Sequence, residues 1–363
     1  MPATAHTVYT LDNPPASLCL LRLSALGDVT HMLPVVHTLQ QYWPTTKLTW
    51  VIGKVERKLV GELPGVEFVV FDKGAGLSEY GRFRAEMRGR RFDLLLHMQV
   101  ALRANLVAAC IPAQLKIGYD DERAKDLHGL FIDRRIPETP QQHVIDGFFS
   151  FLQTAGLSER CDSWSLSETL EDRQWADEIA GGKPVVVISP CSSHSLRNWH
   201  AAGYAQVADH VVEKYGYAVA ICGGNSETEL AMAAEIQSQM QHASENLVGK
   251  DTFGKFIALL RRAELLVSPD AGPAHMGACA GVPVLGLYAA TNPRRSGPYL
   301  SQDYCVDRFD QACQKYLGVS KSEVRWGTKI EKPGVMDLID VESVIERLEH
   351  IFATRDNSQS RGE

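Results

Sequence analysis

The sequence predicts an α/β protein of two tandem, doubly wound domains. Short apolar runs alternate with helical patterns from residue 18 onward, and this alternation pauses once, in a polar stretch at 158–183, before it restarts. Strands that are apolar throughout are typical of a parallel sheet covered by helices on both faces. A chain of 363 residues is too long for one ordinary domain and long enough for two.

The first half opens with the apolar run LCLLRL at 18–23, which predicts a strand. A turn at 24–28 then leads into a helix at 29–42. Further strands are expected at 47–52, 67–71 and 92–98 with helical segments between them, and a helix around 143–157 ends this half.

The second half repeats the pattern after a stretch whose middle, 170–180, is itself helical in character. Strands are expected at 184–190, 217–222, 264–268 and 282–288, and helices at 201–215, 227–240, 252–262 and 272–280. We therefore expect domains at 17–165 and 183–340 that face each other across a cleft. The C-terminal helix, 341–354, is expected to pack on the first domain, with 1–16 and 355–363 as flexible tails.

Composition narrows the class of protein. Hydrophobic residues make up 45% and charged residues 22% of the chain, which is globular composition, and the net charge of −7 argues against general nucleic-acid binding. None of the eight cysteines forms a C-x-x-C pair, which favours a reduced chain without structural zinc. No apolar run reaches the roughly 18 residues of a membrane span, and the start lacks the features of a signal peptide, so we expect a cytoplasmic protein.

Ligands of open α/β sheets bind beyond the carboxyl ends of the strands, so the loops there are the candidate sites. The first loop is 24–28, where Gly27 permits a tight turn and Asp28 stands at the mouth of a helix. The alternative is that Asp28 only caps that helix. The dinucleotide fingerprint G-x-G-x-x-G is absent, which argues against an oxidoreductase.

Two loops of the second half could hold an anion. The loop 189–199 carries several hydroxyls and Arg197 before a helix, although it could equally be a generic polar loop. The loop 268–275 follows a buried strand and opens a helix of small residues. Free N–H groups near Ala271, Gly272 and Ala274 would point at a diphosphate, and His275 lies one turn beyond Asp270, although a histidine there is often structural.

A fourth loop, 222–227, contains two glycines that leave room for a nucleoside. Glu227 at its end could accept hydrogen bonds from ribose hydroxyls.

Together these passages resemble the heptosyltransferases, family nine of the glycosyltransferases. The resemblance rests on LRLSALGDVTHMLP at 21–34, SSHSLRNW at 192–199, the GG-x-x-E turn at 223–227 and SPDAGPAHMGACAGVPVLGLYAATNPRRSGPY at 268–299. It runs in order from about residue 18 to 345 and is nearest the enzymes that add the first heptose to Kdo.

The resemblance implies the GT-B fold, an ADP-heptose donor in the second domain and a Kdo–lipid A acceptor in the first. It implies that Asp28 is the general base of an inverting transfer and that Arg197, where relatives usually have Lys, meets the leaving phosphate. The donor residues it implies are Ser192, Ser193, Glu227, Asp270, Ala271, Gly272, Pro273 and His275. The acceptor residues we expect are Ser24, Gly27, His31, Arg57, Gln99, Arg103 and Arg123.

No cofactor or metal is expected, because the chain lacks a D-x-D pair and the nucleotide sugar is a substrate. Arginines crowd 82–91, and cations recur at 54–58. Such clusters would suit an anionic acceptor or draw the enzyme to the cytoplasmic face of the inner membrane of a Gram-negative bacterium, and a solvated helix face is the alternative. The rival functions are transfer to a later core position, another nucleotide sugar, and a sugar-nucleotide-binding protein without catalysis.

Overall fold

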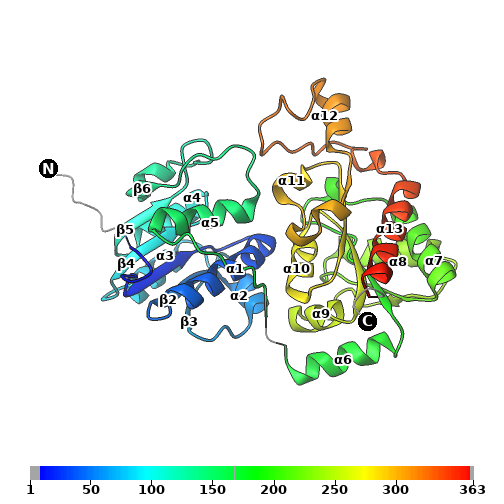
Figure 1. The fold of residues 1–363 in the computed structure, drawn as a ribbon, viewed down its shortest axis with the longest axis horizontal. Helices are drawn as coiled ribbons and strands as arrows, with labels where there is room; N and C mark the ends of the chain where they lie inside the picture. Colours follow the sequence, from blue (N-terminus) through cyan, green and yellow to red (C-terminus); the bar gives the residue numbers. More distant parts are fainter. Residues whose placement is uncertain (1–8, 167, 360–363) are drawn as a thin grey trace. The chain divides into compact units, whose positions relative to one another are not determined.

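The computed structural model describes residues 9–166 and 168–359, which divide into two compact units, 1–167 and 168–363. Each unit is a parallel sheet with helices packed on it, and Figure 1 shows the first in blue to green and the second in green to red. The α/β class and the two doubly wound sheets that the sequence predicts are confirmed.

The sheet of the first unit has six parallel strands in the order β3-β2-β1-β4-β5-β6. Their bounds are β1 Ser17–Leu21, β2 Lys47–Gly53, β3 Val66–Phe71, β4 Phe92–His97, β5 Ala113–Gly118 and β6 Arg134–Arg135. The helices are α1 Leu26–Tyr42, α2 Lys54–Val60, α3 Ser78–Glu86, α4 Leu102–Ala109, η1 His128–Phe131 and α5 Val144–Ala155. The chain order reverses between β1 and β4, which is where ligands of such sheets bind.

Successive side chains of a strand point to opposite faces of the sheet, and here apolar side chains on both faces pack against helices. Cys19 and Leu21 point to one face, where they join a core with Phe83 of α3 and Val107 of α4. On the other face α1 packs against α5. Because both faces are buried, the strands are apolar throughout, as the sequence pattern indicated.

The sheet of the second unit has the order β12-β11-β10-β7-β8-β9, the same topology as the first. Its strands are β7 Val185–Ile188, β8 Ala218–Ile221, β9 Glu245–Asn246, β10 Ala263–Pro269, β11 Val284–Tyr288 and β12 Val306–Asp307. Its helices are α6 Leu170–Ala180, η2 Ser195–Arg197, α7 Ala201–Tyr215, α8 Glu227–Gln239, α9 Phe253–Leu260, α10 Gly272–Ala280, α11 Pro293–Ser296, η3 Tyr299–Tyr304, α12 Phe309–Leu317, η4 Met336–Leu338 and α13 Val341–Gln359.

The helices at the borders of the units differ from the expectation. The helix α6, which we expected within a stretch separating the halves, packs on α9 of the second unit. The C-terminal helix α13 was expected to pack on the first domain, but Val344, Leu348 and Ile351 belong to the core of the second unit, where α13 contacts α7. The apolar face of α13 is therefore buried in the core of the second unit, to which the helix itself belongs.

Part of each expected tail is ordered. Near the N-terminus, the ring of Tyr9 packs edge-on against Trp43, whose indole N–H donates to the Thr10 carbonyl at 3.1 Å. At the other end α13 continues to Gln359. Residues 1–8 and 360–363 lie outside the described residues.

Candidate functional site

The loop after β1 presents Asp28 in the first turn of α1. The helix begins at Leu26 after Ala25, so Asp28 is not the capping residue itself; its carboxylate accepts a hydrogen bond from the Ala25 N–H at 3.3 Å. The same carboxylate forms an ion pair with Arg22 at the end of β1. Arg22 also donates to the Met98 carbonyl at the end of β4. Arg22 therefore links Asp28 to the ends of both neighbouring strands, while the side chain of Asp28 stays 30% exposed.

Two predicted acceptor residues meet beside Asp28. Gln99 accepts a hydrogen bond from the Leu23 N–H at 2.7 Å and donates to the Ser24 hydroxyl at 3.1 Å. This contact arises because β1 and β4 are neighbours in the sheet, so the loops that leave them meet at its carboxyl edge.

His31 lies deeper, one turn along α1 from Gly27. It is buried, and its ring meets that of His143 edge-on at 5.6 Å. His143 itself caps α5 by accepting from the Ile145 N–H at 3.2 Å. His31 therefore lies where α1 faces the start of α5.

The three predicted acceptor arginines occupy separate local networks. Arg57 donates to the Gly61 carbonyl and lies over the ring of Phe68 at 4.1 Å, so it holds the end of α2. Arg123 forms an ion pair with Asp120 and donates to Gln142 at 3.0 Å. Arg103 is exposed on α4. The structure gathers Ser24, Gln99 and Asp28 into one site but does not add these arginines to it.

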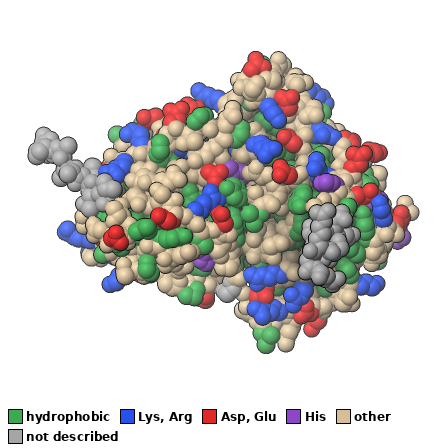
Figure 2. Space-filling view, viewed as in Figure 1, with side chains coloured by type: hydrophobic (Ala, Val, Ile, Leu, Met, Phe, Trp, Pro, Cys, Tyr) green, Lys and Arg blue, Asp and Glu red, His purple; other side chains and the backbone are tan. Residues whose placement is uncertain are grey.

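The cationic segments are partly neutralised. Arg82 pairs with Glu79 and Glu86, and Arg90 pairs with Glu67 at 2.8 Å. On the face shown in Figure 2, Lys and Arg side chains lie among Asp and Glu side chains. Two of the five arginines at 82–91 are thus held in ion pairs with carboxylates of the same unit.

In the second unit, Arg197 is the centre of a charged cluster. It lies in η2, in the loop after β7, and its Nη1 donates to Asp270 at 3.2 Å. Its Nε and Nη2 both donate to Glu331 Oε1, at 3.0 and 2.6 Å. The side chains of Arg197 and Asp270 are only 14% and 11% exposed. The adjacency of β7 and β10 explains why residues far apart in sequence meet here.

The surroundings of Arg197 fix its position. Trp199 is buried and donates to the Ile339 carbonyl at 3.0 Å, which anchors the end of the loop. The Ile330 N–H donates to the Ala290 carbonyl beyond β11 at 2.8 Å, so Glu331 is held at the carboxyl edge of the sheet. The pKa of Lys329 is lowered by burial and by the charge of Arg197.

The start of α10 corrects one detail of the expected anion site. The helix begins at Gly272 with Pro273 in its first turn, as predicted. The Ala274 N–H, however, donates to the Ala271 carbonyl at 3.1 Å and is not free for a ligand. His275 is buried one turn into the helix. Asp270, Ala271 and Gly272 remain at the junction of strand and helix.

The two predicted serines differ. The Ser192 hydroxyl donates to the His194 carbonyl at 2.8 Å and accepts from the His194 N–H at 3.1 Å, so it folds its own loop. Ser193 is exposed. His194 lies 3.5 Å from Glu331 Oε2, which adds it to the cluster around Arg197.

The glycine turn after β8 is held by a residue that the sequence reasoning missed. Glu229 accepts from the Gly224 N–H at 2.7 Å and caps α8 together with Ser226, whereas Glu227 is exposed in the first turn. Nearby, burial and then the charge of Glu229 raise the pKa of Asp251 to about 7.

The missed members of the site fall into two kinds. Arg22, only six residues from Asp28, is a cation beside the predicted base and could have been singled out. Glu331 had no sequence signal, because it reaches Arg197 across 134 residues of chain.

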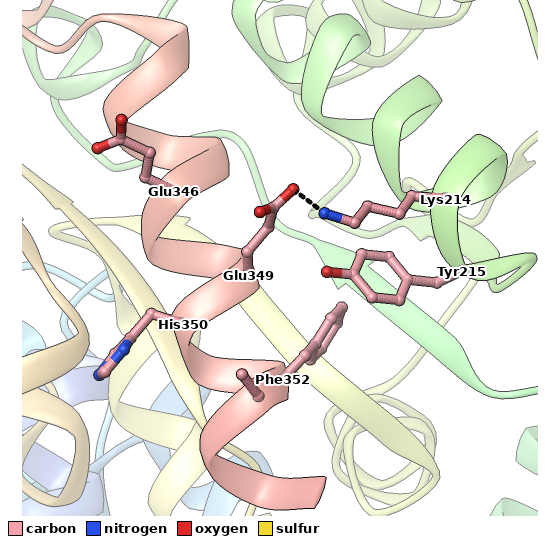
Figure 3. A pocket seen from close by; sticks show the side chains of 7 residues that line it. Lys214, Tyr215, Glu346, Glu349, His350 and Phe352 are labelled. Carbon is pink, nitrogen blue, oxygen red and sulfur yellow. Dashed lines mark hydrogen bonds and ion pairs between the residues drawn. The ribbon is translucent and has the colours of Figure 1, made fainter.

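A shallow pocket lies apart from these residues, between α7 and α13. Figure 3 shows its lining, in which Lys214 and Glu349 form an ion pair. It contains none of the predicted site residues. Across residues 9–166 and 168–359, no cluster of three or more His, Cys, Asp or Glu side chains could hold a metal ion. None of the helices in these ranges combines the length and the apolar composition that a membrane span requires.

Comparison with known proteins identifies relatives of the whole chain. Residues 80–326 match glycosyltransferase family 9 (heptosyltransferase). The chain is 36% identical to the lipopolysaccharide core heptosyltransferase OpsX of Haemophilus influenzae, over 93% of this chain and 97% of that protein. It is 22% identical to lipopolysaccharide heptosyltransferase 1 of Pseudomonas aeruginosa, over 91% and 96%.

Solved structures share the fold. A family 9 glycosyltransferase of Veillonella parvula matches with a TM-score of 0.76 at 21% identity, covering 93% of this chain and 97% of that one. The Escherichia coli heptosyltransferase WaaC with ADP matches with a TM-score of 0.66 at 18% identity, covering 92% and 99%. The predicted GT-B architecture of two Rossmann-like domains is that of these enzymes.

Proposed function

The chain belongs to glycosyltransferase family 9, and from this membership we propose that it is a heptosyltransferase of lipopolysaccharide core assembly. It moves heptose from ADP-L-glycero-D-manno-heptose to a Kdo sugar of the inner core and inverts the configuration at the anomeric carbon. The observation that carries this proposal is the pairing of Asp28 with Arg22 beside Ser24 and Gln99, at the carboxyl edge of the first sheet.

Asp28 acts as the general base. A carboxylate that removes the proton from the acceptor hydroxyl raises the nucleophilicity of that oxygen as it attacks the anomeric carbon. Arg22 fixes the direction of the carboxylate, and the 30% exposed side chain of Asp28 remains accessible to a sugar. The Gln99–Ser24 contact supports an acceptor position close to this base.

The donor binds in the second unit. The bond from the anomeric carbon to the diphosphate breaks with its electron pair, so negative charge develops on ADP. Arg197 supplies a cation and the start of α10 supplies backbone dipoles, and both stabilise that charge. Asp270 and Glu331 orient the guanidinium from two sides. No metal or other cofactor takes part.

The acceptor distinguishes members of this family, since relatives of this chain carry the names heptosyltransferase 1, 2 and 3. We assign Kdo because the motif at 21–34 resembles the enzymes that add the first heptose. Because the Kdo acceptor is linked to a lipid, we place the enzyme at the cytoplasmic face of the inner membrane. The rival within the same chemistry is transfer to a heptose already added.

The test is ADP release from ADP-heptose with Kdo2-lipid A as acceptor, in the presence of EDTA. Asp28→Asn is the most specific variant, because its amide oxygen can still accept from the Ala25 N–H but cannot act as a base. We expect wild type to turn over and Asp28→Asn to lose at least ~100-fold in kcat at unchanged ADP affinity. Full activity of this variant would restrict Asp28 to its structural contacts with Ala25 and Arg22. ADP binding without turnover on Kdo2-lipid A, followed by turnover on a heptosylated core, would reassign the acceptor.

A further inference from the structure

Four leucines are exposed together on the first unit, along α4 and η1. Leu102, Leu106, Leu127 and Leu130 are 53%, 41%, 71% and 76% exposed, and we call them the leucine face. Leu102 and Leu106 lie one turn apart on the outer side of α4, whose other side, with Ala104 and Val107, is buried. The helix thus turns smaller residues to the core and both of its leucines to solvent.

Hydrogen bonds hold the two segments side by side. The carboxylate of Asp126 accepts from the Leu102 N–H at 3.0 Å, and its carbonyl accepts from Asn105 at 2.8 Å. On the other side of Leu127, the imidazole of His128 meets Asn105 Oδ1 at 3.0 Å. Both chain neighbours of Leu127 are therefore fixed to α4, so the leucines of the two segments are held on neighbouring elements.

The backbone holds Leu127 outward in an unfavourable conformation. Asp126 and Leu127 have φ angles of 53° and 61°, in the left-handed region that a leucine rarely adopts. Burying a leucine is favourable, yet this segment is folded so that Leu127 and Leu130 stay in solvent. Exposed leucines gathered on neighbouring elements in this way indicate an interaction site.

Cations border the leucine face. Arg103 and Lys125 are exposed there, and within the described part of the chain neither has an ion pair. The guanidinium of Arg135 lies against η1, since a Cβ on Gly129 would meet its Nη2 at 2.6 Å. Of the nearby carboxylates, Asp126 accepts from the Leu102 N–H at 3.0 Å and Asp121 pairs with Arg135 at 2.9 Å, while Glu122 is exposed.

We propose that the leucine face binds the surface of an anionic lipid bilayer. Leucines beside exposed cations match a surface whose apolar interior lies just beneath negatively charged headgroups. The face also begins three residues after Gln99, so membrane contact would bring a lipid-linked sugar towards Ser24 and Asp28. The proposal rests on the proposed function for the lipid-linked nature of the acceptor, and on the geometry of α4 and η1 for the surface.

The experiment is co-sedimentation of the full chain with vesicles of phosphatidylcholine alone or mixed with phosphatidylglycerol. We expect wild type to bind the mixed vesicles. The double variant Leu127→Asn, Leu130→Gln should bind at least ~10-fold more weakly. Asparagine accepts the left-handed conformation at 127, so this variant folds. The matched control is Leu170→Gln in the second unit, where the leucine is 70% exposed, and it should bind as wild type does.

The proposal is overturned if wild type ignores both kinds of vesicle, or if the double variant binds them as tightly as wild type. It is also overturned if wild type elutes as a dimer that the double variant disrupts, because the face would then join two copies of the chain. ADP release with a detergent-solubilised acceptor is measured in parallel. The double variant should release ADP as wild type does. If wild type itself releases no ADP, that result contradicts the proposed function and not the membrane binding of the leucine face.

Discussion

Arg197 donates two hydrogen bonds to a single oxygen of Glu331, at 3.0 and 2.6 Å, although 134 residues separate them. With Asp270 on Nη1, one cation faces two carboxylates, and these three side chains carry a net charge of −1. A diphosphate that approaches Arg197 must therefore compete with Glu331 or share the guanidinium with it.

Glu331→Gln should tighten ADP binding. The change removes one negative charge from beside the diphosphate position, and the amide oxygen can still accept a hydrogen bond from Arg197. We expect the Kd of ADP to fall by ~3–10-fold at low salt, with a smaller effect at high salt. Titration calorimetry at two salt concentrations checks this. Weaker ADP binding would mean that Glu331 acts chiefly by orienting Arg197.

Arg22→Gln should impair catalysis without affecting donor binding. Arg22 fixes Asp28 and the Met98 carbonyl, both in the first unit. We expect kcat to fall by ~10–100-fold while the KM for ADP-heptose stays within about twofold. Steady-state kinetics measure both constants. Arg90→Gln is the matched control, because it breaks another arginine–carboxylate pair of the same unit, and it should behave as wild type.

The first unit should lose stability in mild acid. His97 and His128 are buried on either side of Asn105. Burial, and then the charge of His128, lowers the pKa of His97 from 6.5 to about 3. Burial, and then the charge of Arg135, lowers the pKa of His128 from 6.5 to about 4. Below about pH 6.5 the unfolded chain protonates these rings and the folded chain does not, so the free energy of unfolding falls as pH falls. The slope is at most about 1.4 kcal/mol per pH unit for each imidazole.

Urea unfolding between about pH 7.5 and pH 5 measures this slope. His97→Gln should flatten it, because one of the two titrating rings is gone. His350→Gln, at an exposed position on α13, should leave it unchanged. Equal slopes in all three proteins would assign the acid sensitivity to other groups.

Gly156→Ala should destabilise the first unit. Gly156 ends α5 with φ at 107°, and a Cβ there would lie 1.9 Å from the Tyr9 carbonyl oxygen. We expect a loss of ~2 kcal/mol or more, from backbone strain and from displacement of the packed N-terminal segment. Gly181→Ala, also at a helix end with positive φ but facing open space, should cost about 1 kcal/mol or less. Thermal unfolding of the two variants gives the comparison.

The local pattern of the sequence was sufficient for most of the fold. Apolar runs placed β1, β2 and β10 to within a few residues, because a strand buried on both faces has few polar side chains. The pattern missed β5, whose residues AQLKIG alternate polar and apolar, and the two-residue strands β6, β9 and β12. The predicted packing of α13 on the first domain was wrong, because the periodicity of a helix shows that it has an apolar face but not which unit covers that face.

For the site, the sequence by itself determined which candidate groups each loop offers: Asp28 after β1, Arg197 after β7, and Asp270 with Gly272 between β10 and α10. Strand order could not be read from the chain, and it is strand order that joins Gln99 to Ser24 and Asp270 to Arg197. Only the tertiary structure supplied Arg22 as the partner of Asp28 and Glu331 as the partner of Arg197. Local spacing fixes which groups a loop offers, whereas the packing of distant segments decides which charges meet.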